Sequence, residues 1–275
     1  MTFEDYKKLD EKALDEPLKE LEDTFREEYN KYLSDINGYI DDIYNEYEDN
    51  NGDIDYTLLI GTLLLTRTKG NIKNINSSLQ SFKLAELNNF FSTVYDAGFN
   101  GNKELFEKEI GQLLNANIDK VKKNKFISNP IAGATTAERM ERNKNQLDFK
   151  ASQTLENSLQ ENKTATQTKK EVKKVYDSDF NNANLIAEAK GHRIVEEGKK
   201  ALAAAVISQG IEPTKTWESM EDSKVRPAHN LLNGTTIPID QDFISENGGK
   251  GPAPGQMGVA ADDINCRCFL SYNIN

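Results

Sequence analysis

The sequence predicts an α+β protein that is predominantly α-helical, with long N-terminal helices followed by a small C-terminal α+β domain that carries a short β-sheet. Two observations lead to this prediction. Residues 17–50 carry apolar side chains at a mean spacing of about 3.6, which is the period of a straight α-helix. After residue 212, short alternating stretches are separated by glycine and proline. We therefore expect a helical region over residues 1–180 and a second domain over residues 181–275.

The acidic helix over residues 17–50 is the best-defined element. Pro17 suits the first turn of a helix, and Asn50-Asn51-Gly52 suits its end. The apolar stripe is narrow and rich in tyrosine, which favours packing against the helix's own domain, with contact to a partner as the alternative. The stripe consists of Leu18, Leu21, Phe25, Tyr29, Tyr32, Ile36, Ile40, Ile43 and Tyr47.

Glycine, proline and polar runs divide the next part of the chain into shorter predicted helices. Glycines are expected to end the first two, and a threonine at 135 or 136 caps a later one. A polar string over residues 177–182 precedes the last helix, so we place the domain junction there. The expected helices cover residues 53–70, 72–98, 105–121, 136–159, 172–176 and 184–209.

The formal net charge of −11 is unevenly distributed. Residues 1–56 carry a net charge of −13, whereas the basic middle, residues 120–174, carries +7. An acidic protein is not suited to coating DNA, because attraction to phosphate supplies most non-specific affinity. The basic middle allows local nucleic-acid contact, although a solvated helical face is the favoured interpretation. The candidate contact residues are Lys169, Lys170, Lys173 and Lys174.

The chemically versatile residues gather in the C-terminal region. It contains the only Trp, both Cys and one of the two His. We expect a strand over residues 215–219, a short helix that begins at Pro227, an edge strand around Pro238 and a Gly/Pro-rich loop over residues 246–258. A terminal strand over residues 264–272 would place both cysteines on one face.

The order of residues in this region resembles the phage Mu F-like family of minor head, or head-morphogenesis, proteins. A Trp-x4-Asp-x3-Arg-x2-His-x4-Gly pattern is followed by a phenylalanine, the Gly/Pro-rich loop and Asn-Cys-Arg-Cys. In the preceding helix, Lys190-Gly191 departs from the pair that the family pattern leads one to expect. The motif residues are Trp217, Asp222, Arg226, His229, Gly234, Asn265, Cys266, Arg267 and Cys268.

This resemblance implies a structural role in the head of a tailed phage. The implied partners are the portal protein and the capsid and scaffold proteins, with contact to packaged DNA, and the implied processes are head assembly and DNA packaging or ejection. The protein would be made in the host bacterial cytoplasm and would reside in the virion, inside the head near the portal. The resemblance implies no enzymatic activity, no required cofactor and no small-molecule substrate.

The sequence also bears on compartment. No apolar run approaches the length of a membrane span, and the N-terminus has no apolar segment typical of a secretory signal. Two cysteines one residue apart on a strand are poorly placed to form a disulfide with each other. We therefore expect no membrane partner and folding in a reducing cytoplasm.

Two other functions remain open at this point. A nuclease-like or toxin-like effector would use His229 as general base, His192 as a second group and Arg226 or Arg267 to stabilise an anion. The favoured alternative for these side chains is a structural network in which Arg226 pairs with Asp222. A nucleic-acid-binding adaptor would instead use the basic middle, residues 120–174.

A structural zinc ion is a further expectation. Two thiols at positions i and i+2 of a strand, about 6.6–7 Å apart along the backbone, can share one tetrahedral ion. Cys266, Cys268 and His229 would be ligands, with Asp222 or His192 as the fourth. The alternative is that both cysteines are small core residues and that His229 bonds to backbone.

Overall fold

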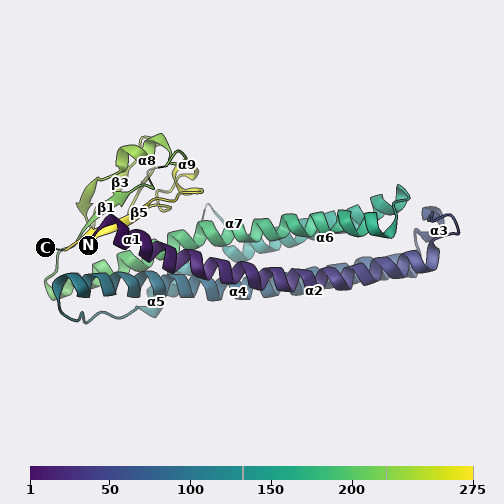
Figure 1. The fold of residues 1–275 in the computed structure, drawn as a ribbon, viewed down its shortest axis with the longest axis horizontal. Coiled ribbons are helices and arrows are strands. Elements are labelled where there is room, and N and C mark those ends of the chain that lie inside the picture. The colour runs from purple at the N-terminus through teal and green to yellow at the C-terminus, as the bar shows by residue number, and fades with distance from the viewer. Residues whose placement is uncertain (132, 221, 275) are drawn as a thin grey trace. The chain divides into compact units, whose positions relative to one another are not determined.

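The computed structural model describes residues 1–131, 133–220 and 222–274, and these are predominantly helical, as predicted (Figure 1). None of the helices in these ranges combines the length and apolar character that crossing a membrane requires. A π-helical segment, η1 (Glu11–Asp15), and a 3-10 segment, η2 (Val206–Gln209), flank the longer helices. The α-helices are α1 (Phe3–Asp10), α2 (Glu16–Tyr47), α3 (Tyr56–Leu59), α4 (Leu63–Ile110), α5 (Lys120–Ser128), α6 (Thr136–Gln160), α7 (Ala165–Ala205), α8 (Pro227–Leu232) and α9 (Ala260–Asp263).

The strands form two small antiparallel sheets. In the first, β1 (Thr214–Glu218) lies between β2 (Thr236–Pro238) and β5 (Phe269–Asn273). The second pairs β3 (Phe243–Ile244) with β4 (Lys250–Gly251). β2 is an edge strand, as its proline predicts, because proline has no N–H to donate to a further strand.

The described chain divides into two compact units, each built from segments that are distant in sequence. Unit 1 contains Met1–Leu21, Leu87–Gly133 and Leu185–Asn275, and unit 2 contains Glu22–Glu86 and Ala134–Asn184. The division within α7 lies close to the predicted junction. Two N-terminal segments nevertheless belong to the same unit as the C-terminal region, so the units do not follow the predicted ranges 1–180 and 181–275.

Unit 2 is helical, and the stripe of α2 is part of its core. Phe25, Ile36 and Ile40 on this stripe are fully buried. The Tyr29 hydroxyl donates to Asp179 of α7 at 2.5 Å. The interpretation that this helix packs within its own domain is therefore confirmed. α6 begins as predicted, with a capping box in which Thr135 bonds the backbone of the first turn.

The predicted break before residue 184 is wrong, because α7 is one helix from Ala165 to Ala205. The polar string over residues 177–182 is not a linker. Its Asp179 is buried in unit 2 and accepts from Lys83 Nζ at 2.6 Å as well as from Tyr29. A polar residue that forms a buried ion pair resembles a linker residue in sequence, and this caused the error.

The predicted division of residues 53–121 is also wrong, because α4 runs without interruption from Leu63 to Ile110. Gly70 and Gly98 lie inside it. In unit 1, a Cβ on Gly98 would lie 2.5 Å from the Val195 carbonyl oxygen of α7, and one on Gly198 of α7 would lie 2.4 Å from the Tyr95 carbonyl oxygen. These two glycines allow α4 and α7 to approach closely, which is a packing role and not a stop signal.

The N-terminal segment of unit 1 packs on its sheet. The Tyr6 hydroxyl donates to the Tyr272 carbonyl at 3.3 Å, and the Phe3 and Phe269 rings lie 5.2 Å apart. α2 begins at Glu16, so Pro17 lies in its first turn, as predicted, and the π-helical segment η1 precedes it. Proline has no N–H for a helical bond, and the widened turn accommodates that missing donor.

Candidate metal centre

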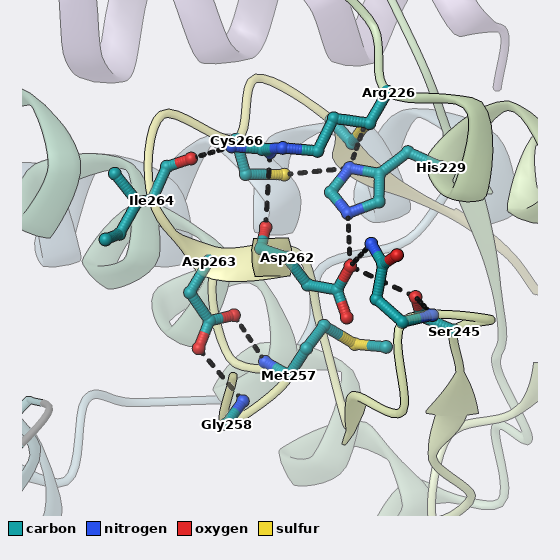
Figure 2. A network of polar contacts seen from close by, with 11 residues as sticks. Arg226, His229, Ser245, Met257, Gly258, Asp262, Asp263, Ile264 and Cys266 are labelled. Carbon is teal, nitrogen blue, oxygen red and sulfur yellow. Dashed lines mark hydrogen bonds and ion pairs between the residues drawn. The ribbon is translucent and has the colours of Figure 1, made fainter. Parts of the chain in front are cut away.

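The rare side chains of the C-terminal motif are positioned by short elements of unit 1. Trp217 lies on β1, His229 on α8, and Asp262 on α9, with both cysteines between α9 and β5. α8 begins at Pro227 and is followed by Gly234, whose φ is +75°. The predicted short helix is therefore confirmed, and it directs His229 into the interior (Figure 2).

Both cysteine thiols face the same nitrogen of His229. Cys266 Sγ lies 3.6 Å and Cys268 Sγ 3.5 Å from His229 Nδ1. The three ligand atoms lie within 4.8 Å of one another. The exposed fractions are 1% for His229, 7% for Cys266 and 3% for Cys268, and both cysteines are free. The structure thus brings together the three residues that the sequence suggested as metal ligands.

Asp262 determines which nitrogen of His229 carries the hydrogen. Its Oδ1 lies 3.3 Å from His229 Nε2. A carboxylate is an acceptor, so Nε2–H donates to it and the lone pair of Nδ1 faces the thiols. Asp262 Oδ1 also accepts from Ser245 Oγ at 3.0 Å (Figure 2) and from Asn247 Nδ2 at 2.7 Å. The imidazole orientation is therefore fixed from behind by a network of side chains.

Sequence reasoning missed Asp262, Ser245 and Asn247. The one available signal was a pair of aspartates shortly before the Asn-Cys-Arg-Cys run. Gly249 belongs to the same arrangement, because a Cβ there would lie 2.1 Å from Asp262 Oδ2. The Gly/Pro-rich loop was predicted as a connection, whereas part of it packs directly against the carboxylate that orients His229.

Asp263 fastens the end of this loop to α9. Its Oδ1 accepts from the Met257 amide at 2.6 Å and its Oδ2 from the Gly258 amide at 2.9 Å (Figure 2). Charge-assisted bonds to two successive amides hold an otherwise irregular backbone in one conformation. The segment that leads to the cysteines is therefore anchored at its start.

Arg226 holds the backbone at the end of α9, just before the cysteines. Its guanidinium donates to the Asp262 carbonyl at 3.5 Å and to the Ile264 carbonyl. The predicted pairing of Arg226 with Asp222 is wrong, because Asp222 Oδ1 instead accepts from Arg267 at 2.6 Å. Arg226 thus positions backbone, and Arg267 positions a surface carboxylate.

The predicted terminal strand begins later than expected. β5 covers Phe269–Asn273, Ile264 is 57% exposed, and Asn265 has a φ of 54°. Asparagine tolerates this left-handed conformation better than most residues, and it interrupts an extended chain. The cysteines therefore lie on a bent segment, which allows both thiols to reach one nitrogen.

Trp217 forms one wall of the site. Its fully buried ring lies 5.3 Å from the His229 ring and 5.2 Å from the Phe243 ring, both in edge-to-face geometry. The Trp217 carbonyl accepts from the Gly234 amide at 2.8 Å. The aromatic contacts exclude water on this side of His229, and the glycine turn keeps α8 next to β1.

The two thiols differ in acidity. A hydrogen bond to Cys268, together with burial, raises the pKa of Cys266 well above its ordinary value. The same bond lowers the pKa of Cys268, which receives it. Burial opposes a charge on His229, but its contacts with Cys266 and Asp262 raise its pKa.

The two residues that the sequence suggested as a fourth ligand lie elsewhere. His192 belongs to a second buried group in unit 1, where its ligand atom and those of Asp10 and Glu196 lie within 4.8 Å of one another. Asp222 pairs with Arg267 near the surface. Neither joins the His229 group within the described ranges, so both suggestions are wrong. We call His229, Cys266 and Cys268 the thiol cluster, and Asp10, His192, Glu196 and Lys199 the carboxylate cluster.

A cation already occupies the carboxylate cluster. Lys199 Nζ lies 2.8 Å from Asp10 Oδ1 and 2.5 Å from Glu196 Oε1. Burial opposes the lysine charge, but the two carboxylates raise its pKa above the ordinary value. A pocket of about 580 Å³ is lined by Cys266 of the thiol cluster and by Asp10 and His192 of the carboxylate cluster.

The lysines suggested for nucleic-acid contact lie on α7 in unit 2. Lys169 pairs with Asp41 at 2.5 Å, Lys173 with Asp177 at 2.7 Å, and Lys174 with Glu171 at 2.8 Å. Lys170 is exposed. Most of these charges therefore have acidic neighbours, as expected of a solvated helical face.

Comparison with known proteins identifies a family that the C-terminal part of the chain resembles. Residues 150–271 match the model of the phage Mu protein F-like family. This range contains every residue of the motif, from Trp217 to Cys268. The resemblance seen in the sequence is confirmed over this part of the chain.

Two relatives differ in how much of each chain they share. The chain is 28% identical to minor head protein GP7 of Bacillus phage SPP1 over 233 residues, which cover 84% of this chain and 75% of that protein. It is 24% identical to an NAD(+)–arginine ADP-ribosyltransferase, EFV, of Enterococcus faecalis over 144 residues, which cover 52% of this chain and 29% of that enzyme. No solved structure matches the chain.

Proposed function

We propose that this chain is a structural minor head protein of a tailed phage, which contacts the portal protein and acts by position in head assembly and in DNA packaging or ejection. One observation carries the proposal. The alignment with the minor head protein of phage SPP1 extends over 84% of this chain, so it is much longer than the C-terminal motif. Likeness over most of both chains supports a shared role better than likeness confined to one motif.

The geometry gives little support to an effector that uses His229. One nitrogen of this histidine faces two thiols, the other faces a carboxylate, and the side chain is buried. A general base must lie within hydrogen-bond reach of a substrate proton. The match to the transferase covers only 29% of that enzyme, so it gives no ground for assigning that activity to this chain.

The alternative of a nucleic-acid-binding adaptor is also less well supported. Three of the four candidate lysines are paired with carboxylates of the chain, which reduces the charge available to phosphate. The proposed partners are therefore the portal protein and the capsid and scaffold proteins, with packaged DNA as a neighbour. The proposed location is the head interior near the portal, after synthesis in the host cytoplasm.

Mass spectrometry of purified phage tests this proposal. We expect the protein in mature particles at a fixed low copy number relative to the portal protein, and cross-links between the two. Comparison with particles that have released their DNA shows whether the protein leaves with it. Absence from mature particles would contradict the proposal.

A charge variant separates the structural role from the adaptor role. Replacement of Lys169, Lys170, Lys173 and Lys174 by glutamine should leave incorporation into particles unchanged. Loss of the variant from particles, with its helical content intact by circular dichroism, would instead favour the basic face as the assembly determinant.

A further inference from the structure

The hydrogen-bonding capacity of His229 does not account for the arrangement of the thiol cluster. With Nε2–H directed at Asp262, Nδ1 has one lone pair and accepts one hydrogen bond well. Two thiols nevertheless approach it, at 3.6 Å and 3.5 Å. The three ligand atoms therefore surround a common point, which is the arrangement that a bound ion requires.

The distances agree with tetrahedral coordination of zinc. With Zn–S of about 2.3 Å and Zn–N of about 2.05 Å, a tetrahedral ion separates its sulfur and nitrogen ligands by about 3.6 Å. Both distances from Sγ to Nδ1 in the thiol cluster match this value. The separation of all three atoms, within 4.8 Å, leaves room for the expected distance between the sulfurs.

The hydrogen bond from His229 Nε2 to Asp262 is of the kind that zinc-binding histidines usually make. A histidine that binds a metal commonly donates its other N–H to a carboxylate, which fixes the ring and makes the nitrogen more basic. Asp262 holds this position and is itself oriented by Ser245 and Asn247. These bonds orient the imidazole for a ligand at Nδ1.

We propose that the thiol cluster binds one structural Zn²⁺ through His229 Nδ1, Cys266 Sγ and Cys268 Sγ, with a water molecule as the fourth ligand on the side where Cys266 lines the pocket. On binding, each thiol releases its proton to solvent. Two thiolates and a neutral imidazole then balance the ion's two positive charges. Soft sulfur ligands with one imidazole select zinc over magnesium or calcium.

The proposed ion would add a link between parts of the chain that are distant in sequence. His229 lies on α8, and the cysteines lead into β5, with the Gly/Pro-rich loop between them in sequence. A metal bond across this loop stabilises the folded state, because the ligands are separated when the chain is unfolded. This inference goes beyond the proposed function and holds or fails independently of incorporation into particles.

Metal analysis of the purified full-length protein is the first test. We expect close to one zinc per chain by inductively coupled plasma mass spectrometry. Removal of zinc by a chelator should lower the Tm by about 5–10 °C, and added zinc should restore it. With cobalt in place of zinc, thiolate-to-metal charge-transfer absorption should appear. Protein that binds no zinc after reconstitution and keeps its Tm would overturn the proposal.

Matched variants assign the ligands. Cys266→Ser, Cys268→Ser and His229→Ala should each lose zinc, whereas His192→Gln and Asp222→Asn should retain it. The controls remove the other buried histidine and the carboxylate that sequence alone suggested. If a ligand variant fails to fold, the cobalt spectrum of the wild-type protein still decides whether thiolates bind the metal. Retention of stoichiometric zinc by folded Cys266→Ser and Cys268→Ser would contradict the assignment.

Discussion

The thiol cluster and the carboxylate cluster belong to the same unit, and both group metal-ligand side chains within 4.8 Å. The two clusters differ in the groups that contact their ligand side chains. In the carboxylate cluster, Lys199 Nζ contacts both Asp10 and Glu196. In the thiol cluster, His229 contacts two thiols and a carboxylate.

This comparison shows that proximity of ligands does not by itself define a metal site. An ammonium group between two carboxylates uses the oxygen lone pairs that a metal would need. Lys199 and Glu196 lie three residues apart on α7, so this pairing is local. The thiol cluster draws on α8 and on the segment before β5, and its geometry depends on the tertiary fold.

The largest expected effect comes from removing the cation of the carboxylate cluster. Lys199→Met should lower the free energy of unfolding by about 3–5 kcal/mol, because it leaves buried carboxylates without a partner. Urea denaturation measures this. Lys200→Met is the matched control, because its pair with Glu197 is partly exposed and should cost at most about 1 kcal/mol.

The zinc content of Lys199→Met tests whether the two clusters are independent of each other. Lys199→Met should keep the zinc of the thiol cluster, since Lys199 Nζ contacts Asp10, Glu196 and the Leu270 carbonyl, none of which is a proposed zinc ligand. Equal destabilisation by Lys199→Met and Lys200→Met would show that the buried carboxylates find other compensation.

A smaller effect is expected from changing Asp262, which orients His229 of the thiol cluster. Asp262→Asn should weaken zinc affinity by about 10–100-fold, because the amide no longer accepts a charge-assisted bond from His229 Nε2. Competition with a chromophoric chelator measures the affinity. Asp263→Asn, which alters the loop contact and not the histidine contact, is the control. A change in Tm without a change in zinc affinity would mean that Asp262 has only a structural role.

The sequence predicted elements whose signals are local. The period of α2, the capping box of α6 and the proline at the start of α8 each depend on residues within a few positions of one another. The errors arose where a local signal had a tertiary cause. Gly98 resembles a helix terminator but allows close helix packing, and Asp179 resembles a linker residue but forms a buried ion pair.

The residues of the candidate site likewise fall into those that the sequence identified and those that only the fold brings together. Cys266, Cys268 and His229 were identified because their residue types are rare in this chain and suit one ion. Asp262 was missed, because aspartate is common here and only the folded loop brings it to His229 Nε2. Asp222 and His192 were suggested as ligands by type alone, and the fold gives them other partners.

The last expected effect is a pH dependence within the carboxylate cluster. Burial raises the pKa of Glu196 to about 8, above that of the unfolded chain. Asp10 keeps some exposure, so it is the better-hydrated of the two carboxylates that share Lys199. Between the unfolded pKa and about 8, the folded state therefore binds a proton that the unfolded state has lost, and stability falls as pH rises through this window.

Glu196→Gln removes this titration, so its stability relative to wild type should increase from pH 5 to pH 8, as measured by urea denaturation at each pH. Glu188→Gln is the control, because Glu188 is an exposed carboxylate on the same helix and is hydrated in both states. A constant difference between Glu196→Gln and wild type across this range would show that Glu196 is ionised throughout. In that case Lys199 would mainly stabilise the negative charge of Glu196, and solvent would stabilise the negative charge of Asp10.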